Sequence, residues 1–317
     1  MSQECKKISI IIPVYNEEQS LQKLHSLFCE VLNGLRYEYE LIFVNDGSSD
    51  RSQALLEEFR RADRHVRVIE FSRNFGKEIA LTAGLQFCTG DAAVMIDSDL
   101  QHPIELLSQF IQKWQDGAEV VIGVRISNTG EGMVKRLGSK LYYRIMRWIS
   151  EVEIVPQSTD YRLLDRSVID AFKHFSEHNR MTRALIDWLG FRREYIYFHA
   201  AERFDGSTVR YTFSKLFRLA TDSIISLSFF PLRLAGYLGS AIVVLSSLLG
   251  AFIVFEQYFL HDPLHLGVSG TGMLALLIIF LVGIVLACLG LIALYIATIQ
   301  HEVLSRPLYV VRKAKKE

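Results

Sequence analysis

The sequence predicts an α/β domain with a mostly parallel sheet, followed by a helix at a membrane surface and a hairpin of two transmembrane helices. Short β-branched runs alternate with helical segments over the first 125 residues, which is the element order of parallel α/β sheets. Polar residues follow each of these runs at its carboxyl end. Beyond about residue 228 the chain is mostly apolar and holds two long stretches without lysine. These observations predict a globular domain joined to a membrane anchor.

Five apolar runs have the length and the flanking residues of buried strands. They cover residues 8–13, 41–45, 66–71, 92–97 and 120–124. A helical pattern follows each of the first four runs. The first covers 18–35, the second ends at about residue 62, the third ends at residue 88, and the fourth begins near Pro103. Strands joined by helices in this way pair in parallel through right-handed crossovers. A later helix, at 167–175, is expected to begin at an Asp165 cap.

The polar residues at the carboxyl ends of the predicted strands form a common set. They are Tyr15, Glu17, Asp46, Arg73, Asp97, Asp99 and Arg125. Ordinary turn chemistry explains any one of them, since aspartate and asparagine are frequent in loops. Because the carboxyl ends of parallel strands meet at one edge of a sheet, the whole series predicts a shared ligand crevice.

The centre of this series is the segment Asp97-Ser98-Asp99 after the fourth run. Alternate residues of a strand share a side, so Asp97 and Asp99 face the same way if strand geometry continues through Ser98. Unpaired carboxylates so close together repel each other at neutral pH, and a divalent cation relieves the repulsion. Oxygen ligands suit Mg²⁺ or Mn²⁺. An isolated pair of this kind is more often part of a turn or a helix cap.

Composition excludes several classes of protein. The 317 residues carry 35 basic and 35 acidic side chains, so no nucleic-acid partner is expected. The four cysteines are scattered, which predicts neither a disulfide framework nor a zinc site. The chain contains no G-x-G-x-x-G after the first strand and no G-x-x-x-x-G-K-[ST], which argues against dinucleotide dehydrogenases and P-loop NTPases. The polar start of the chain predicts no cleavable signal peptide.

Three motifs in series carry a resemblance to a known family. They are Ile-Ile-Pro-Val-Tyr-Asn-Glu at 11–17, Val-Asn-Asp-Gly-Ser-Ser-Asp at 44–50 and Asp-Ser-Asp-Leu-Gln-His-Pro at 97–103. In order and spacing they resemble the inverting family 2 glycosyltransferases of GT-A fold. The resemblance is closest to the polyprenyl-phosphate group, which includes dolichyl-phosphate mannose synthase and bactoprenol glucosyltransferases, and it covers essentially the whole chain.

The resemblance implies roles for residues of the donor side. The nucleotide would be held by Pro13, Tyr15, Glu17, Asp46 and Asp97. Mg²⁺ or Mn²⁺ would be held by Asp97 and Asp99 with Gln101 close by, and Asp99 would be catalytic through that metal. A metal of this kind neutralises charge that develops on a diphosphate leaving group.

The acceptor side is implied in the same way. The lipid phosphate would be bound by Arg125, Arg136, Ser139 and Arg203, with Lys135 as an alternative to Arg136. Arg203 would also be catalytic, through its contact with the phosphates. In some relatives an aspartate at the position of Asp160 is the proposed base. The acceptor phosphate is already ionised at neutral pH, so Asp160 is expected to orient it more than to remove a proton.

Charge asymmetry predicts how the chain meets the membrane. About 20 apolar residues cross a hydrocarbon layer of about 30 Å, and two stretches, at 232–260 and 273–299, are long enough. Basic residues flank the pair on both sides, whereas the connector 261–271 has none. The positive-inside rule then places the catalytic domain and both termini in the cytoplasm. The domains are expected at 1–210, 211–230 (an interfacial amphipathic helix), 231–300 (the two spans) and 301–317 (a basic tail).

The sequence therefore predicts an integral membrane enzyme. Its reaction would be the transfer of one hexose, from UDP-glucose or another UDP-sugar, to a polyprenyl phosphate such as undecaprenyl phosphate, for modification of a cell-envelope glycan. A processive polysaccharide synthase is an alternative, but the chain lacks Gln-x-x-Arg-Trp, since Arg183 and Trp188 do not fit that spacing. A non-catalytic membrane scaffold is a second alternative. Both a monomer and a homo-oligomer are compatible with the sequence.

Overall fold

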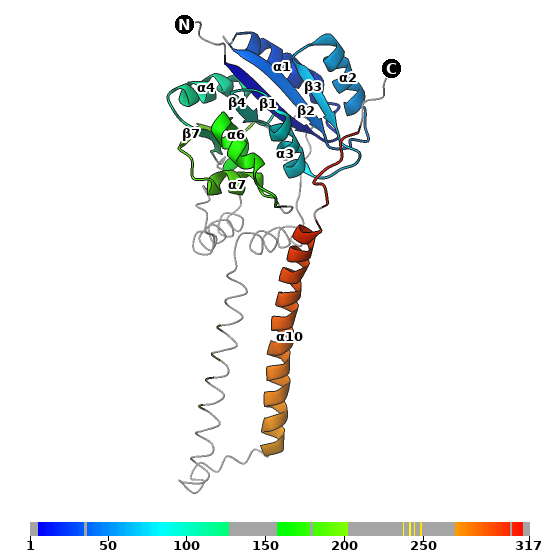
Figure 1. Ribbon diagram of the computed structural model, residues 1–317, viewed down its shortest axis with the longest axis vertical. Helices are drawn as coiled ribbons and strands as arrows, with labels where there is room; N and C mark the ends of the chain where they lie inside the picture. Colours follow the sequence, from blue (N-terminus) through cyan, green and yellow to red (C-terminus); the bar gives the residue numbers. More distant parts are fainter. Residues whose placement is uncertain are drawn as a thin grey trace. The chain divides into compact units, whose positions relative to one another are not determined.

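The computed structural model describes residues 6–34, 37–126, 157–177, 180–201, 270–304 and 306–312, together with the isolated residues 237, 241, 244 and 248. The chain divides into two compact units. The first contains Met1–Trp148, Val152–Tyr211 and Arg306–Glu317, and the second contains Ile149–Glu151 and Thr212–Ser305. Figure 1 labels most of the helices and strands of the described residues.

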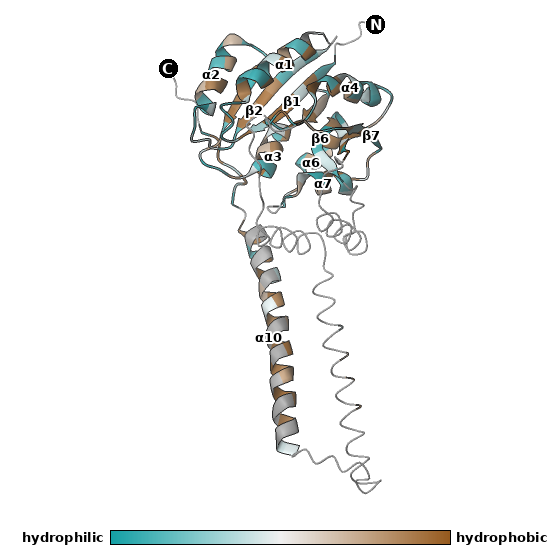
Figure 2. Cartoon of the chain, turned by 180° about the vertical axis from the view of Figure 1, so that it is seen from behind, coloured by the Kyte–Doolittle hydropathy of each residue, from teal (hydrophilic) through white to brown (hydrophobic). Residues whose placement is uncertain are grey.

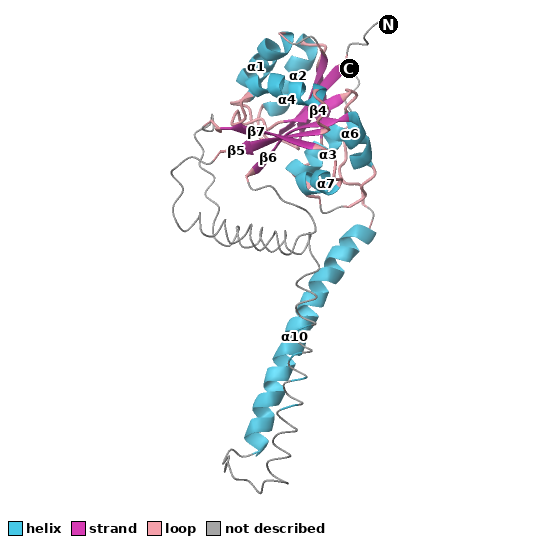
Figure 3. Ribbon diagram, turned by 90° about the vertical axis from the view of Figure 1, so that its left-hand side faces the viewer, coloured by secondary structure: helices cyan, strands magenta, loops and turns pink. Residues whose placement is uncertain are grey.

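The first unit is built on a seven-stranded sheet, whose strands are magenta in Figure 3. The strand order is β3-β2-β1-β4-β6-β5-β7. The strands are β1 (Lys7–Val14), β2 (Glu38–Asn45), β3 (Val66–Glu70), β4 (Ala92–Met95), β5 (Val120–Arg125), β6 (Ser158–Asp165) and β7 (Arg193–Phe198). Among these described strands β6 alone is antiparallel to its neighbours. The predicted mostly parallel α/β sheet is therefore confirmed.

Helices cover both faces of this sheet. They are α1 (Leu21–Asn33), α2 (Ser52–Ala62), α3 (Lys77–Phe87), the 3₁₀ turn η1 (Ile104–Leu106), α4 (Leu107–Gln115), α6 (Arg166–Lys173) and α7 (Thr182–Trp188). Successive residues of β1 point to opposite faces, so Ile10 and Ile12 pack under α1, α2 and α4, whereas Ile11 packs under α3, α6 and α7. Apolar strands buried on both faces are typical of parallel sheets. In Figure 2, β1 and β2 are largely brown, the colour of hydrophobic residues.

The five predicted strands all form, with ends shifted by a few residues. The fourth is shorter than expected because it ends at Met95 instead of Asp97. The strands β6 and β7 were not predicted. The Asp165 cap is confirmed, since its carboxylate accepts a hydrogen bond from the Ser167 amide at 2.9 Å at the start of α6.

A segment near the C-terminus, within the predicted tail at 301–317, belongs to the first unit. Val311 bridges Phe71 in antiparallel fashion just beyond β3, and the Tyr309 ring stacks on the Phe71 ring at 4.9 Å. The Arg312 guanidinium pairs with Glu70 at 2.6 Å. These contacts cover one end of an edge strand that would otherwise expose unpaired backbone groups.

The second unit contains α10 (Gly270–Val303), which includes the second predicted span, 273–299. Within the residues that the structure describes, no helix qualifies by length and apolar character as a membrane span. The predicted hairpin is therefore not confirmed. The interfacial helix at 211–230 and nearly all of the first span, 232–260, lie outside the described residues.

Candidate active site

The candidate site lies at the edge of the sheet where the parallel strands end. Because β6 runs antiparallel to β4, the amino end of β6 meets the carboxyl end of β4 at this edge. This inversion brings Asp160, near the start of β6, beside the acidic segment that follows β4. A chain with only parallel strands would have placed Asp160 at the opposite edge.

The acidic segment after β4 forms a turn instead of continuing the strand. Leu100 has a positive φ of 60° in this turn, and the Gln101 amide donates to the Asp99 carboxylate at 3.1 Å. The expectation that Asp97 and Asp99 meet by strand alternation is therefore wrong. They do converge, because the turn gathers ligand atoms of Asp97, Asp99 and His102 within 4.8 Å of one another.

Lys77 places a cation in this centre. Its ammonium lies 2.6 Å from Asp97 Oδ1 and 2.7 Å from Asp160 Oδ2, so it bridges carboxylates from two strand ends. Burial acts to lower the pKa of Lys77, but the charges of Asp97 and Asp160 outweigh it and raise that pKa. The lysine is therefore fully charged at neutral pH and holds the two carboxylates in fixed positions.

Asp160 is ionised in this arrangement. Burial acts to raise the pKa of its carboxyl group, but Lys77 outweighs burial through both charge and hydrogen bonding, so the pKa lies below its usual value. Arg162, two residues further along β6, is fully buried and pairs with Asp187 of α7 at 2.8 Å. That pair anchors the strand that carries Asp160.

His102 completes the cluster from the far side of the turn. Its ring packs beside Tyr161 and Phe198, with centroid separations of 5.4 and 5.6 Å. Its Nδ1 lies 3.8 Å from Asp97 Oδ2 and has no hydrogen-bond partner within the described part of the chain. Burial lowers the pKa of His102 in spite of the neighbouring carboxylates, which favours the neutral imidazole that binds metal ions.

A cavity of about 230 Å³ opens beside this cluster. Its lining brings together the whole set of predicted donor-site residues, together with Asn74 and Lys77 from the segment after β3. The predicted members are Pro13, Tyr15, Glu17, Asp46, Asp97 and Asp99. A second cavity of about 240 Å³ also borders Glu17 and Asp99. The structure therefore places the predicted donor residues at one site.

Asp46 has a structural role at this site that the sequence did not indicate. Its two oxygens accept hydrogen bonds from the Phe75 and Gly76 amides, at 2.6 and 2.9 Å. Burial raises the pKa of Asp46, with these hydrogen bonds opposing the shift. Gly47 makes the close approach possible, since it has a positive φ of 68° and a Cβ there would lie 2.4 Å from the Arg73 carbonyl carbon. Asp46 thus holds the segment that delivers Lys77.

The remaining predicted residues are less closely placed. The Gln101 side-chain amide donates to the Ala201 carbonyl at 3.4 Å, so its role as a metal ligand stays a prediction. Arg125 is exposed at the end of β5, on the same edge of the sheet. The other predicted acceptor residues, Arg136, Ser139 and Arg203, lie outside the described residues, as does Lys135.

Comparison with known proteins identifies the family. The model of the family described as glycosyl transferase family 2 matches residues 9–183, which run from within β1 through β6 and include the acidic turn. The chain belongs to glycosyl transferase family 2. Its predicted family is therefore confirmed, and it is an enzyme that transfers a sugar.

Several relatives of this glycosyltransferase match along nearly its full length. A Synechocystis protein described as an uncharacterized glycosyltransferase is 39% identical over 305 residues, covering 96% of this chain and 94% of its own. A Shigella flexneri protein named as a prophage-derived bactoprenol glucosyl transferase is 35% identical over 308 residues, covering 97% and 98%. Among solved structures, mannosyl-3-phosphoglycerate synthase from Rubrobacter xylanophilus has a TM-score of 0.49 at 13% identity, over 69% of this chain and 72% of its own.

A divalent cation fits the donor atoms of this glycosyltransferase. The turn supplies two carboxylates, from Asp97 and Asp99, and the buried, unpartnered His102 Nδ1 beside them. Carboxylate oxygens with one imidazole nitrogen suit Mn²⁺ and are compatible with Mg²⁺. Lys77 balances part of the negative charge of the Asp97 and Asp160 carboxylates.

Lys77 and His102 are site residues that the sequence reasoning missed. Lys77 reads as an ordinary lysine in the first turn of a helix, and His102 as a residue after a turn. The sequence offers one weak signal for both: Lys77 lies four residues after Arg73, and His102 lies three residues after Asp99, so each is close to a predicted strand-end residue. Only the fold shows that Lys77 reaches across to β6, because the strand β6 itself was not predicted.

Proposed function

We propose that the chain transfers a single hexose from a nucleotide sugar to a polyprenyl phosphate, with inversion at the anomeric carbon. The donor is UDP-glucose or another UDP-sugar, and the acceptor is undecaprenyl phosphate. The observation that carries the proposal is the near-full-length similarity to proteins named bactoprenol glucosyl transferase, at 34–35% identity. The product would be a lipid-linked sugar for modification of cell-envelope glycans.

The donor half of the reaction draws on the cavity beside the acidic turn. Tyr15, half-exposed at the rim, offers an aromatic face for a base, and Glu17 offers a carboxylate for ribose hydroxyls. Asp97 and Asp99 lie where the diphosphate would end. Asp97 and Asp99, with His102 or Gln101 as a further ligand, would hold a divalent cation, which would supply positive charge to stabilise a departing diphosphate.

The transfer forms one bond and breaks another at the same carbon. A phosphate oxygen of the acceptor attacks the anomeric carbon, and the bond from that carbon to the β-phosphate oxygen of the donor breaks. No proton has to be removed from the acceptor, because a phosphate monoester is ionised at neutral pH. Asp160, held anionic by Lys77, is then an orienting group at the acceptor side of the carbon.

The acceptor phosphate needs cations, because it must approach carboxylates of the same sign. Arg125 is exposed at the correct edge of the sheet. Arg136, Ser139 and Arg203 complete the acceptor site in this proposal. Arginine suits the role because its planar fork binds two phosphate oxygens at once.

The proposal places the enzyme in the cytoplasmic membrane, with the catalytic domain and both termini in the cytoplasm. Two helices, at about 232–260 and 273–299, form the anchor. Support comes from the basic flanks of these stretches and from the large apolar side chains exposed along α10, such as Leu274, Phe280 and Val285. In intact cells, an impermeant maleimide should label a cysteine placed in 261–271 and should not label one placed in the catalytic domain. The reverse pattern would contradict this topology.

A donor panel tests the reaction itself. The detergent-solubilised full chain is incubated with undecaprenyl phosphate and radiolabelled UDP-glucose, UDP-galactose, UDP-N-acetylglucosamine or GDP-mannose, and organic extracts are counted. We expect one UDP-sugar to give a lipid-linked monosaccharide of inverted configuration. Omitting the lipid and substituting Asp99→Asn are the controls. Processive polymer, or transfer to water alone, would contradict the proposal.

A further inference from the structure

A second cluster of metal-ligating side chains lies away from the carboxyl-end site. His25 and Cys29 are one turn apart on α1, so they share a face of that helix. Asp63 follows the last residue of α2, and His65 precedes β3. Ligand atoms of His25, Cys29 and Asp63 all lie within 4.8 Å of one another.

The separations in this cluster are longer than those of strong hydrogen bonds. The Cys29 Sγ lies 3.7 Å from His25 Nε2, and His25 Nε2 lies 3.6 Å from Asp63 Oδ2. Tetrahedral Zn²⁺ with bonds of about 2.0–2.3 Å separates its ligand atoms by roughly 3.3–3.8 Å. The two separations in this cluster match edges of such a tetrahedron.

A nucleophilic relay does not explain the same three residues. In a Cys-His-Asp relay the thiol and the carboxylate contact opposite nitrogens of the imidazole ring. Here both the Cys29 sulfur and the Asp63 carboxylate face the same nitrogen, Nε2 of His25. Three ligand atoms therefore converge on one point, which is the arrangement of a cation site.

We propose that His25, Cys29 and Asp63 bind a thiophilic divalent cation of the Zn²⁺ class, distinct from the cation of the donor site. Thiolate and imidazole ligands favour Zn²⁺ over Mg²⁺, whereas the donor site offers mainly carboxylate oxygens. All three residues are partly exposed, so water can take the fourth position. These ligands do not show a zinc-type spacing in the sequence, because the third ligand lies 34 residues beyond Cys29.

The ligands are held in place by their neighbours. Asp63 Oδ1 accepts hydrogen bonds from the His65 amide and from the His65 ring nitrogen Nδ1, each at 2.8 Å, which leaves Oδ2 directed at His25. The His25 ring stacks on Phe59 at 4.4 Å, with an interplanar angle of 7°. Supporting contacts of this kind fix the orientation of metal ligands.

The cation would connect α1 to the junction between α2 and β3. Burial and the nearby Asp63 charge raise the pKa of the Cys29 thiol, so the cation displaces a proton when it binds. α1 begins four residues after Glu17, which lines the donor cavity. The site therefore braces the element that follows a donor-binding loop, and none of its ligands lines that cavity.

Cobalt substitution tests the site through a signal that the donor site cannot give. The untagged full chain in detergent is titrated with Co²⁺, and the thiolate-to-cobalt charge-transfer band in the near ultraviolet is recorded. We expect one equivalent of this band in the wild type, its loss in Cys29→Ser, and its retention in Cys288→Ser and Asp99→Asn. Absence of the band in the wild type, or its survival in Cys29→Ser, would overturn the proposal.

Thermal unfolding with Zn²⁺ provides a second readout, with His25→Asn and Asp63→Asn as variants that keep the thiol. Far-ultraviolet circular dichroism checks that each variant is folded. We expect Zn²⁺ to raise the Tm of the wild type. The affinity for Zn²⁺ should be at least about tenfold weaker in each variant than in the wild type. An equal Zn²⁺-dependent rise in Tm in wild type and variants would contradict the assignment, as would no rise in the wild type.

Discussion

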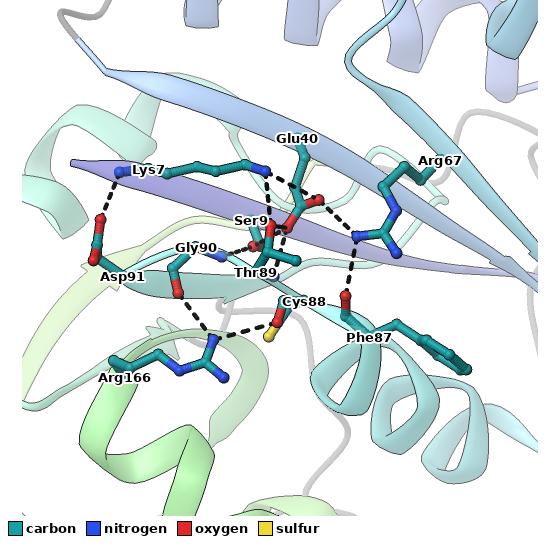
Figure 4. Close-up of polar contacts among 10 residues, drawn as sticks. All are labelled: Lys7, Ser9, Glu40, Arg67, Phe87, Cys88, Thr89, Gly90, Asp91 and Arg166. Atoms are coloured by element: carbon teal, nitrogen blue, oxygen red, sulfur yellow. Dashed lines mark hydrogen bonds and ion pairs between the residues drawn. The ribbon is translucent and has the colours of Figure 1, made fainter. Parts of the chain in front are cut away.

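Two acidic centres lie at opposite edges of the same sheet and differ in how their charge is satisfied. At the amino ends of the strands, the buried Glu40 accepts hydrogen bonds from the hydroxyls of Ser9 and Thr89, at 2.6 and 2.8 Å. It also accepts from the Thr89 amide at 2.7 Å and from Arg67 at 2.8 Å (Figure 4). At the carboxyl ends, Asp97 and Asp99 converge with His102, whose Nδ1 has no hydrogen-bond partner in the described part of the chain.

The difference separates a structural carboxylate from a functional one. The protein supplies Glu40 with enough donors to lower its pKa to about 2: burial acts to raise that pKa, and the bonds from Ser9, Arg67 and Thr89 outweigh it. Such a group stabilises the fold and needs no ligand. At the carboxyl-end centre Lys77 pairs with the carboxylates of Asp97 and Asp160. We infer that a metal ion and the donor complete that centre.

The largest expected effect follows Asp99→Asn. Loss of one carboxylate from the acidic turn should lower kcat by about 100- to 1,000-fold, because charge on the leaving diphosphate is then poorly stabilised. The Tm should change little, since Asp99 borders the cavity and is not part of the core. Transfer of radiolabelled sugar and thermal unfolding measure the two quantities on one preparation. A fully active variant would remove Asp99 from the site.

Lys77→Met should have the next largest effect, a fall of about 10- to 100-fold in kcat/KM. Lys77 keeps the pKa of Asp160 low, so its removal should raise that pKa and move the acid limb of the kcat/KM profile to higher pH. Lys77→Arg keeps the charge and should leave the acid limb close to its original position. If the limb does not move in Lys77→Met, ionised Asp160 does not act in transfer.

Glu40→Gln should lower the stability of the fold while leaving the activity nearly unchanged, the reverse of what is expected for Asp99→Asn. Replacing the carboxylate leaves Arg67 and Lys7 without their shared anion, which costs about 2 kcal/mol and lowers the Tm by about 4–8 °C. The kcat/KM should stay within about twofold, because the edge that carries Glu40 is remote from the acidic turn. Glu38→Gln, at the exposed start of the same strand, is the matched control and should leave the Tm unchanged.

The smallest effect concerns pH and stability. The folded-state pKa of Glu40 is about 2, below the usual 4.5. The contribution of Glu40 to the free energy of unfolding is therefore fully present when the pH is above 4.5, and it is lost as the pH falls from 4.5 toward 2. Wild type should lose more stability than Glu40→Gln over this window in chemical denaturation. If the free energy of unfolding falls equally with pH in the two proteins, Glu40 is not the source of the acid sensitivity.

The sequence was sufficient for the parts of the fold that depend on local pattern. Buried parallel strands are continuous apolar runs, so β1 to β5 could be recognised, and strand-end polar residues led to the donor cavity. The strands β6 and β7 were missed. β6 carries Asp160 and Arg162 among its residues, and β7 is half-exposed at the sheet edge, so neither has the apolar pattern of the other strands.

Residues that act through distant partners were not recognisable from the sequence. Lys77 meets Asp160, 83 positions away, and Glu40 meets Thr89, 49 positions away. No periodicity records such contacts, because they depend on strand order. The convergence of Asp97 and Asp99 was predicted for the wrong reason, since a turn and not a strand brings them together.

In the proposed function, the carboxyl-end carboxylates form a cation-dependent transfer site. The most direct measurement is transfer to undecaprenyl phosphate, from the donor that the panel identifies, in excess EDTA and after return of Mg²⁺ or Mn²⁺ alone. We expect activity to fall by at least about 100-fold and to recover with either ion, without added Zn²⁺. Full activity in excess EDTA would contradict this account.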